Sequence, residues 1–150
     1  MQIALGSDHA GFPLKMHLVE FLKTSGRPYC DCGVFSEDSA DYPDSASAVA
    51  KAVLSGQSDL GVLICGTGIG MSIAANKYRG IRAALCNDSY SACCAREHNN
   101  ANILTMGSRV IGPGLAVNIL KSFLETTFEG GRHNRRLEKI AMIEKSMPGN

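Results

Sequence analysis

The sequence predicts a Rossmann-like three-layer α/β/α sandwich with a five-stranded parallel sheet and an extra C-terminal helix. Two observations predict it: short apolar runs of strand length alternate with segments of helical periodicity, and glycine-containing turns follow several of the apolar runs. Strands that alternate with helices form a parallel sheet covered on both faces, because each right-handed crossover returns the chain to the same edge. A length of 150 residues suits a single domain over 1–150.

The first half of the chain contains two predicted βα units. A strand over residues 2–6 precedes a helix that has Pro13 near its start, Gly26 after its end and an apolar face of Leu14, Leu18, Phe21 and Leu22. A second strand over residues 29–32 leads through a polar loop, residues 36–43, to an alanine-rich helix over about 44–54.

The second half continues the same alternation. Residues 60–65, with the sequence LGVLIC, form the clearest strand, and a glycine-rich turn leads from it into a helix that ends near residue 76. Strands follow at 81–86 and 103–106, with helices at 89–97 and 113–124 and a last helix from about residue 134.

Composition and charge exclude several classes of protein. Fifteen basic and 14 acidic residues give a net charge of +1, which provides no general field for nucleic acid or an anionic membrane surface. No apolar run reaches the roughly 18 residues that a membrane span needs, and the first residues have no basic segment typical of a secretory signal. We therefore expect a cytoplasmic protein.

The six cysteines are expected to be reduced thiols rather than a disulfide framework. Cys30 and Cys32 have C-x-C spacing and Cys93 and Cys94 are adjacent, so no pair has the C-x-x-C spacing typical of zinc or redox sites. Cys94 with His98, one helical turn later, supplies at most half of a metal site. The sequence therefore predicts no metal site.

The loop that begins at Cys65 is the strongest candidate site. In open parallel sheets ligands bind beyond the carboxyl ends of the strands, and here a thiol at such an end meets three glycines and a helix start, whose N–H groups can stabilise a thiolate. A dinucleotide-binding fingerprint needs glycine at position 71, and a thiol phosphatase would have arginine there, so Met71 excludes both. The Gly-Lys-Ser/Thr of a phosphate-binding Walker loop is also absent. The pattern indicates a base beside an oxyanion site, and the alternative is a tight turn with a buried cysteine.

Other polar residues are ambiguous when each is taken alone. Asp8 and His9 end the first strand and face the same crevice, or they form a helix cap with a surface imidazole. His98 and Asn99 are placed to act chemically or to cap a helix end. Tyr42 is either a packing residue or a hydroxyl donor.

A basic segment opens the last predicted helix. Arg132 and Arg136 lie one turn apart near its N-terminus, which suits a phosphate clamp, although a solvated basic face fits the same spacing. Arg109, which follows the fifth strand, is undecided by its position alone.

Together the motifs resemble the ribose-5-phosphate isomerase B family and the related LacA and LacB sugar-phosphate isomerases. The resemblance spans essentially the whole chain, in order, and rests on the motifs GSDHAG at 6–11, DYP at 41–43, ICGTGIG at 64–70, residues 72–77, GIRA at 80–83, EHN at 97–99 and GGRH at 130–133.

The resemblance implies a role for each matching residue. Cys65 matches the catalytic base, Thr67 lies beside it, and the amides of Gly66, Thr67, Gly68, Ile69 and Gly70 match an anion hole for an enediolate. The match assigns ring opening to His98 and contacts with the sugar to Asp8 and Asn99, and Tyr42 of the DYP motif is a further substrate-binding residue. It assigns the phosphate to His9, Arg109, Arg132 and Arg136.

The resemblance also implies the reaction and the partners. The expected activity is interconversion of ribose 5-phosphate and ribulose 5-phosphate in the pentose phosphate pathway, through a cis-enediolate and without a cofactor. The implied assembly is a homodimer, or a dimer of dimers, with active sites shared between chains. An apolar stripe on the last helix, formed by Leu137, Ile140, Ala141 and Met147, suits docking on a neighbour.

Two alternatives remain open at this point. One is the same chemistry on a hexose, with allose 6-phosphate or galactose 6-phosphate as substrate. The other is a non-catalytic flavodoxin-like module whose glycine loop holds the phosphate of a ligand.

Overall fold

Five parallel strands form one sheet in the order β2-β1-β3-β5-β4, in a computed structural model that describes residues 1–146. The strands are β1 (Ile3–Ser7), β2 (Tyr29–Asp31), β3 (Leu60–Cys65), β4 (Ala83–Leu85) and β5 (Ile103–Gly107). Every strand pairing is parallel, so all five carboxyl ends lie at one edge of the sheet. The predicted sheet is confirmed.

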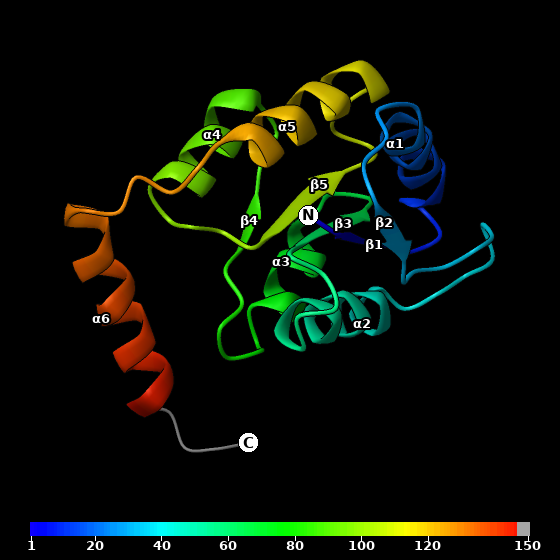
Figure 1. The fold of residues 1–150 in the computed structure, drawn as a ribbon. Coiled ribbons are helices and arrows are strands. Elements are labelled where there is room, and N and C mark those ends of the chain that lie inside the picture. The colour runs from blue at the N-terminus through cyan, green and yellow to red at the C-terminus, as the bar shows by residue number, and fades with distance from the viewer. Residues whose placement is uncertain (147–150) are drawn as a thin grey trace.

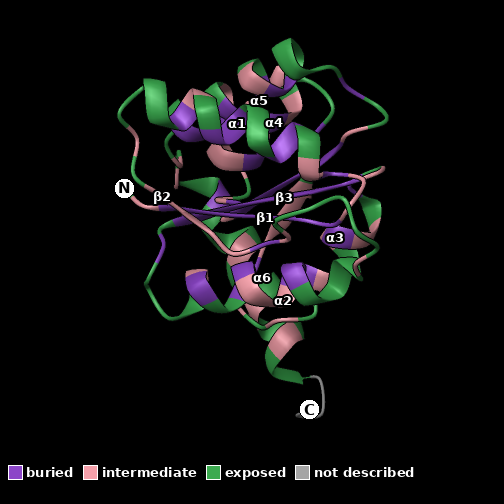
Figure 2. Cartoon of the chain, turned by 90° about the vertical axis from the view of Figure 1, so that its right-hand side faces the viewer, coloured by how far each residue is buried: buried purple, intermediate pink, exposed green. Residues whose placement is uncertain are grey.

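Helices cover both faces of the sheet, as the alternating pattern predicts. Figure 2 shows the buried strands between two helical layers, with α1 (Phe12–Thr24), α4 (Ser89–Glu97) and α5 (Pro113–Glu125) on one face and α2 (Tyr42–Leu54) and α3 (Ile69–Ala75) on the other. The extra C-terminal helix, α6 (Arg132–Ser146), stands at the side of the molecule (Figure 1).

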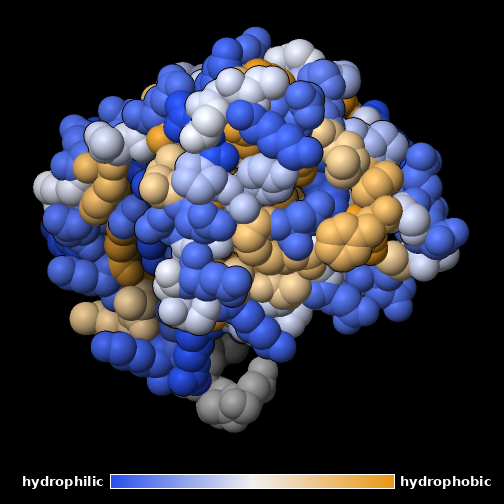
Figure 3. All heavy atoms as spheres, turned by 45° about the vertical axis from the view of Figure 1, so that its right-hand side comes forward, coloured by the Kyte–Doolittle hydropathy of each residue, from blue (hydrophilic) through white to orange (hydrophobic). Residues whose placement is uncertain are grey.

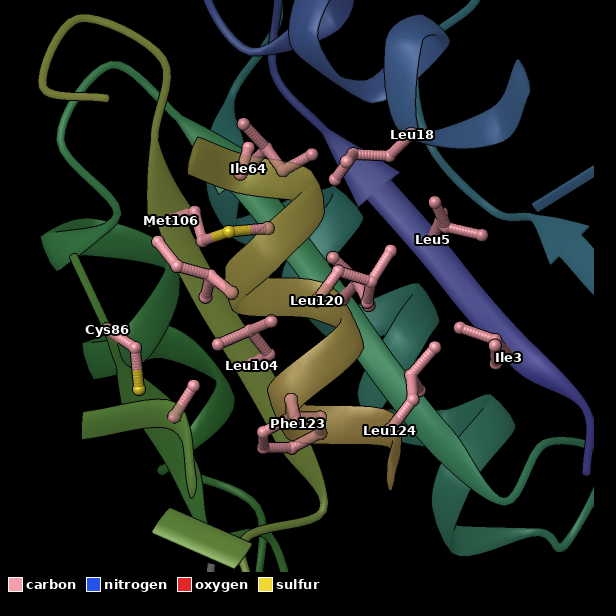
Figure 4. Packing of buried hydrophobic residues seen from close by; sticks show 14 of the residues in the cluster. Ile3, Leu5, Leu18, Ile64, Cys86, Leu104, Met106, Leu120, Phe123 and Leu124 are labelled. Carbon is pink, nitrogen blue, oxygen red and sulfur yellow. The ribbon is translucent and has the colours of Figure 1, made fainter. Parts of the chain in front are cut away.

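Two apolar cores hold these layers together. On one face, Leu120 and Phe123 of α5 pack with Leu104 and Met106 of β5 and with Leu5 of β1 (Figure 4). The smaller core on the other face joins alanines of α2 to β1, β3 and β5. Every residue of β3 is buried, which explains why this strand reads as an uninterrupted apolar run.

The start of α2 differs from the sequence prediction. We expected Tyr42 in a loop and the helix from residue 44, but the helix begins at Tyr42 and includes Pro43 in its first turn. Proline is tolerated there because the first N–H groups of a helix have no partner within the helix. Tyr42 is therefore held by a regular element.

Helix α6 touches the rest of the chain near its two ends. At its start His133 is buried, and near its end the carboxylate of Glu144 accepts hydrogen bonds from the Gly80 amide at 3.3 and 3.2 Å. Along the predicted apolar stripe Leu137 and Ala141 are half-buried and Ile140 is exposed, while Met147 lies outside the described residues.

Large apolar side chains are exposed on several elements of the described chain. On α6 they include Met142 and Ile143, which the sequence analysis did not single out, and elsewhere they include Phe35 and Tyr90. On the face seen in Figure 3, hydrophobic atoms gather in a patch with hydrophilic atoms around it. Gathered apolar surface of this kind is typical of places where another molecule binds.

All six cysteines are free thiols, as expected, and Cys65 and Cys86 are buried. The sulfur atoms of Cys30 and Cys32 lie 3.0 Å apart. Within residues 1–146 there is no helix that combines the length and the apolar character needed to cross a membrane.

A buried ion pair joins the first two βα units. The Lys15 side chain is fully buried, and its Nζ donates to both carboxylate oxygens of Asp31, at 2.6 and 2.7 Å, and to the Val34 carbonyl at 2.7 Å. The aromatic rings of Phe12 and Phe35 lie 5.4 and 5.1 Å from the ammonium. These contacts fix the chain where it leaves β2 for the loop before α2.

We predict that Asp31→Ala destabilises the protein more than Lys15→Met does. The first substitution leaves a buried ammonium without its counter-ion, which costs about 3–5 kcal/mol, whereas the second leaves a carboxylate that is 20% exposed and can be hydrated. Urea denaturation of the variants at one protein concentration measures the difference. Equal losses would show that the charge pair is not what stabilises this junction.

Candidate functional site

Cys65 ends β3 with its thiol buried beneath the glycine loop. The side chain is 5% exposed, and the amide of Gly68 donates a hydrogen bond to Sγ at 3.1 Å. Gly68 has a φ of +78°, and a Cβ there would lie 2.5 Å from a side-chain carbon of Leu85. Only glycine fits this position, and it turns an N–H toward the sulfur, where the donor can stabilise negative charge.

The neighbouring strand β5 supports this loop from below. Gly107 pairs with Cys65 in the sheet, and a Cβ on Gly107 would lie 2.7 Å from the backbone of Thr67. The Thr67 hydroxyl accepts a hydrogen bond from the Ile69 amide at 3.3 Å. The missing side chain at residue 107 therefore lets the loop lie directly on the strand end.

Asp8 and His9 lie in the loop after β1, at the same edge of the sheet. The Asp8 amide donates to the carbonyl of Ile64, the residue before Cys65, at 3.2 Å, and its carboxylate accepts from the Gly11 amide at 2.8 Å. Asp8 is therefore a turn cap as well as a neighbour of the Cys65 loop. His9 is half-buried and its Nδ1 lies 3.3 Å from the carbonyl oxygen of Ala40.

Arg109 and Tyr42 reach the same loop from two other elements. The Arg109 amide donates to the Gly66 carbonyl at 3.0 Å, and a Cβ on Gly66 would lie 3.5 Å from Cδ of the arginine. The ring of Tyr42 packs against Gly70, where an added Cβ would lie 2.9 Å from it. The carboxyl edge thus collects Asp8, His9, Tyr42, the loop 65–70 and Arg109.

Ser108 also belongs to this edge, although the sequence analysis did not single it out. Its hydroxyl donates to the Ala10 carbonyl at 2.7 Å and lies 3.2 Å from the Cys65 carbonyl, which its amide also reaches at 2.9 Å. It joins three strand-end loops. Its position directly after the fifth predicted strand could have identified Ser108 from the sequence as a residue of this edge.

The remaining predicted residues form a second cluster at the end of α4. His98 follows this helix and its ring stacks on that of His133, with centroids 4.5 Å apart and planes 13° apart. Arg132 Nε lies 3.4 Å from Nε2 of His133, and Arg136 Nη1 lies 3.4 Å from its Nδ1. The structure therefore brings His98, Arg132 and Arg136 together.

Asn99, the next residue, is exposed on the same side of the molecule. Its carbonyl accepts a hydrogen bond from Arg82 Nε at 3.1 Å. Burial lowers the pKa of Arg82, while the nearby Glu144 carboxylate acts in the opposite direction. Asn99 also lines a cavity of about 270 Å³ beside β4 and Ile140.

Within one chain the two clusters lie at opposite edges of the sheet. Cys65 is level with Gly107 at the carboxyl end of β5, whereas His98 precedes the amino end of that strand. A rise of about 3.3 Å per residue separates the two ends of this strand by about 13 Å. The two clusters are therefore separate within one chain, and its His98 does not meet its own Cys65.

A carboxylate near the second cluster raises the question of a metal. Side-chain ligand atoms of His98, Glu129 and His133 lie within 4.8 Å of one another. The lone pairs of an imidazole lie in the plane of its ring, so two stacked rings do not point at a common ion. Two guanidinium groups beside His133 further disfavour a cation, so this cluster suits anions better.

Comparisons with known proteins agree with this architecture. A protein of Escherichia coli named ribose-5-phosphate isomerase B is 50% identical over 144 residues, which cover 96% of this chain and 97% of that protein. A protein of Pectobacterium atrosepticum named D-erythrulose-4-phosphate isomerase is 44% identical, with 96% of this chain and 95% of that protein covered.

Among solved structures, ribose-5-phosphate isomerase B of Clostridium thermocellum superimposes with a TM-score of 0.95 at 52% identity, and the match covers 97% of this chain and 98% of that one. The family described as Ribose/Galactose Isomerase matches residues 3–140, which is nearly the full length of the chain. This match, together with the parallel sheet and the Cys65 loop, shows that the chain belongs to the ribose/galactose isomerase family.

Proposed function

We propose that this protein is an aldose-ketose isomerase that interconverts ribose 5-phosphate and ribulose 5-phosphate. The observation that carries the proposal is the Cys65 thiol, held at a strand end with the Gly68 amide directed at its sulfur. The relatives from Escherichia coli and Clostridium thermocellum, which share 50% and 52% of their residues with this chain, carry the name of this activity.

Cys65 acts as the base that moves one proton between two carbons. Its thiolate removes the proton from C2 of the open-chain aldose, which forms a cis-enediolate with its charge on O1. The proton of the C2 hydroxyl passes to O1, and the thiol returns a proton to C1 as C2 becomes the carbonyl. The reaction is redox-neutral overall because the electron pair stays within the substrate. Amides of the loop, together with Thr67, stabilise the enediolate oxygen.

Two chains build each active site in this proposal. The half-site with Cys65 lies at the carboxyl edge, and the half-site with His98, Asn99, Arg132 and Arg136 lies near the amino edge, so a second copy supplies what one chain cannot bring together. The exposed Ile140, Met142 and Ile143 of α6 provide apolar surface for such a contact. The proposed assembly is a homodimer, alone or as part of a dimer of dimers.

The remaining residues divide between the sugar and the phosphate. His98 assists opening of the furanose ring, Asp8 and Asn99 bind hydroxyl groups, and Tyr42 closes the site beside Gly70. His9 and Arg109 of one chain and Arg132 and Arg136 of the other bind the phosphate, since guanidinium groups form strong paired hydrogen bonds with its oxygens.

A pentose phosphate is favoured over a hexose phosphate as the substrate. The family description names both ribose and galactose isomerases, but the relatives from Escherichia coli and Clostridium thermocellum, at 50% and 52% identity, are named for ribose 5-phosphate. The six free cysteines agree with a reducing compartment, and we place the enzyme in the cytoplasm. A turnover assay across both sugar classes separates it from a hexose isomerase and from a non-catalytic binding module.

The first test is Cys65→Ala, which removes the proton carrier. Turnover of ribose 5-phosphate should fall by about 10²- to 10⁴-fold while the thermal transition persists. Cys30→Ala, which removes a half-buried thiol from β2, serves as the matched control and should retain activity. Near-normal turnover of Cys65→Ala would remove the proposed base.

Mixing two inactive variants tests the shared site. We predict that Cys65→Ala and His98→Asn, each weakly active alone, regain activity when they are unfolded and refolded together. In a mixed dimer one site has both wild-type residues, so random pairing gives about one quarter of the wild-type activity per chain. If the mixture stays as inactive as its components, Cys65 and His98 do not come from different chains.

The phosphate residues on α6 are tested by Arg132→Ala and Arg136→Ala. Loss of each charge-assisted contact should cost about 1.5–3 kcal/mol of transition-state stabilisation, which lowers kcat/KM roughly ten- to more than a hundredfold. Inorganic phosphate should also inhibit these variants less than it inhibits the wild type. Arg135→Ala, on the same helix and also exposed, is the matched control. Unchanged constants in the first two variants would assign both arginines to a solvated surface.

A further inference from the structure

His133 is the one buried side chain on the described part of α6, with 3% of its surface exposed. The apolar residues of this helix are half-buried or exposed, so burial of an imidazole here does not serve an apolar core. The ring instead lies flat against that of His98, at a centroid separation of 4.5 Å. Packing of an apolar core therefore does not explain why His133 is buried against His98.

The backbone before α6 is shaped to bring this ring to the end of α4. Gly130 and Gly131 have φ values of +70° and +54°, a pair of successive left-handed residues that only glycine adopts readily. The Glu129 amide donates to the Glu97 carbonyl at 3.0 Å, which ties the segment to the residue before His98. The His133 amide then donates to the Gly130 carbonyl at 2.9 Å.

Both nitrogen atoms of the buried His133 ring have polar neighbours, of which the Glu129 carboxylate is the nearest. Nε2 lies 3.1 Å from a carboxylate oxygen of Glu129 and 3.4 Å from Nε of Arg132, and Nδ1 lies 3.4 Å from Nη1 of Arg136. Rotation of this ring would break contacts on both edges at once. His133 therefore has a fixed plane.

His98 has much less support of its own. Its side chain is 35% exposed, and Nε2 lies 3.5 Å from a carboxylate oxygen of the adjacent Glu97, a separation too long for a strong hydrogen bond. The contact that defines the plane of its ring is the face of His133. A fixed ring thus supports an exposed one.

We infer that His133 is a positioning residue that sets the orientation of the His98 imidazole for opening of the sugar ring. The inference rests on the proposed function of His98. Proton transfer to a ring oxygen needs the donor nitrogen in line and within hydrogen-bond distance, so a rotated or mobile imidazole loses much of its effect. His133 does not touch the reacting atoms; it acts through the stacked face.

The substrate chemistry separates ring opening from proton transfer. Ribose 5-phosphate closes to a furanose, but ribulose 5-phosphate stays open because its only hydroxyl placed to form a five-membered ring carries the phosphate. Exchange of the C1 proton of ribulose 5-phosphate with deuterated water therefore needs Cys65 and the enediolate but no ring opening. Net conversion of ribose 5-phosphate needs both steps.

The test compares His133→Ala with His133→Phe, which keeps a flat ring but removes both nitrogens. His133→Ala should lower kcat for ribose 5-phosphate by about ten- to a hundredfold, and His133→Phe should regain only part of this loss, because it keeps the stacked face but loses the contacts at both nitrogens. The KM, the inhibition constant of inorganic phosphate and the rate of C1 exchange should change little in either variant. His17→Ala, at an exposed histidine of α1, is the control.

A second variant and a spectroscopic readout guard against misfolding. Glu129→Gln weakens one contact at the edge of the His133 ring. It should lower kcat for ribose 5-phosphate less than His133→Ala does and leave C1 exchange little changed. The ring-proton shifts of His98, observed by NMR, should lose the ring-current effect of the stacked partner in His133→Ala and keep one in His133→Phe. Unchanged shifts in His133→Ala would overturn the inference whatever the activity.

Three kinetic outcomes would also overturn it. Equal losses of isomerisation and C1 exchange would give His133 a general structural role. A weaker response to inorganic phosphate with kcat preserved would make it a phosphate ligand. A His133→Phe variant no better than His133→Ala would show that stacking is not the cause. A wild-type protein without turnover of ribose 5-phosphate would instead refute the proposed function, and with it the catalytic meaning of the pair.

Discussion

The pairing of β3 with β5, which sets Cys65 beside Gly107, is the contact on which the site depends. Because residue 107 has no side chain, the loop after Cys65 lies directly on the end of β5, with the Thr67 backbone in the space a Cβ would fill. The loop then turns at Gly68 and directs an amide at the sulfur. A larger residue at 107 would lift this loop and separate the thiol from its donor.

The same parallel arrangement explains why the chain carries two separate clusters of candidate site residues. Parallel strands put every carboxyl end at one edge, so each strand-end loop gathers around Cys65, while a helix that returns the chain must end near the opposite edge. His98 sits at the end of such a helix. Separation of the two groups is therefore a consequence of the fold, and in the proposed dimer a symmetric second copy brings them together.

Of the 15 residues of helix α6, His133 alone is buried. The helix is anchored at His133 and at the Gly80 amide, and it exposes Ile140, Met142 and Ile143 between and beside those anchors. This arrangement places Arg132 and Arg136, the proposed phosphate ligands, and His133 on an element that also exposes apolar surface. Substrate binding and assembly would then share one helix.

The sequence by itself determined the sheet, its five strands and the thiol at a strand end, because alternating apolar periodicity and the glycine turns are local signals. It also picked out Asp8, Arg109, His98 and the arginines through motif resemblance. It misjudged the start of α2 at Tyr42, where a proline at a helix start looks like a loop. Only the tertiary structure decided that Cys65 and His98 lie at opposite edges, that Ser108 joins three loops and that the ring of His133 stacks on that of His98. Those relations depend on strand order and on contacts between residues distant in sequence, which no local pattern encodes.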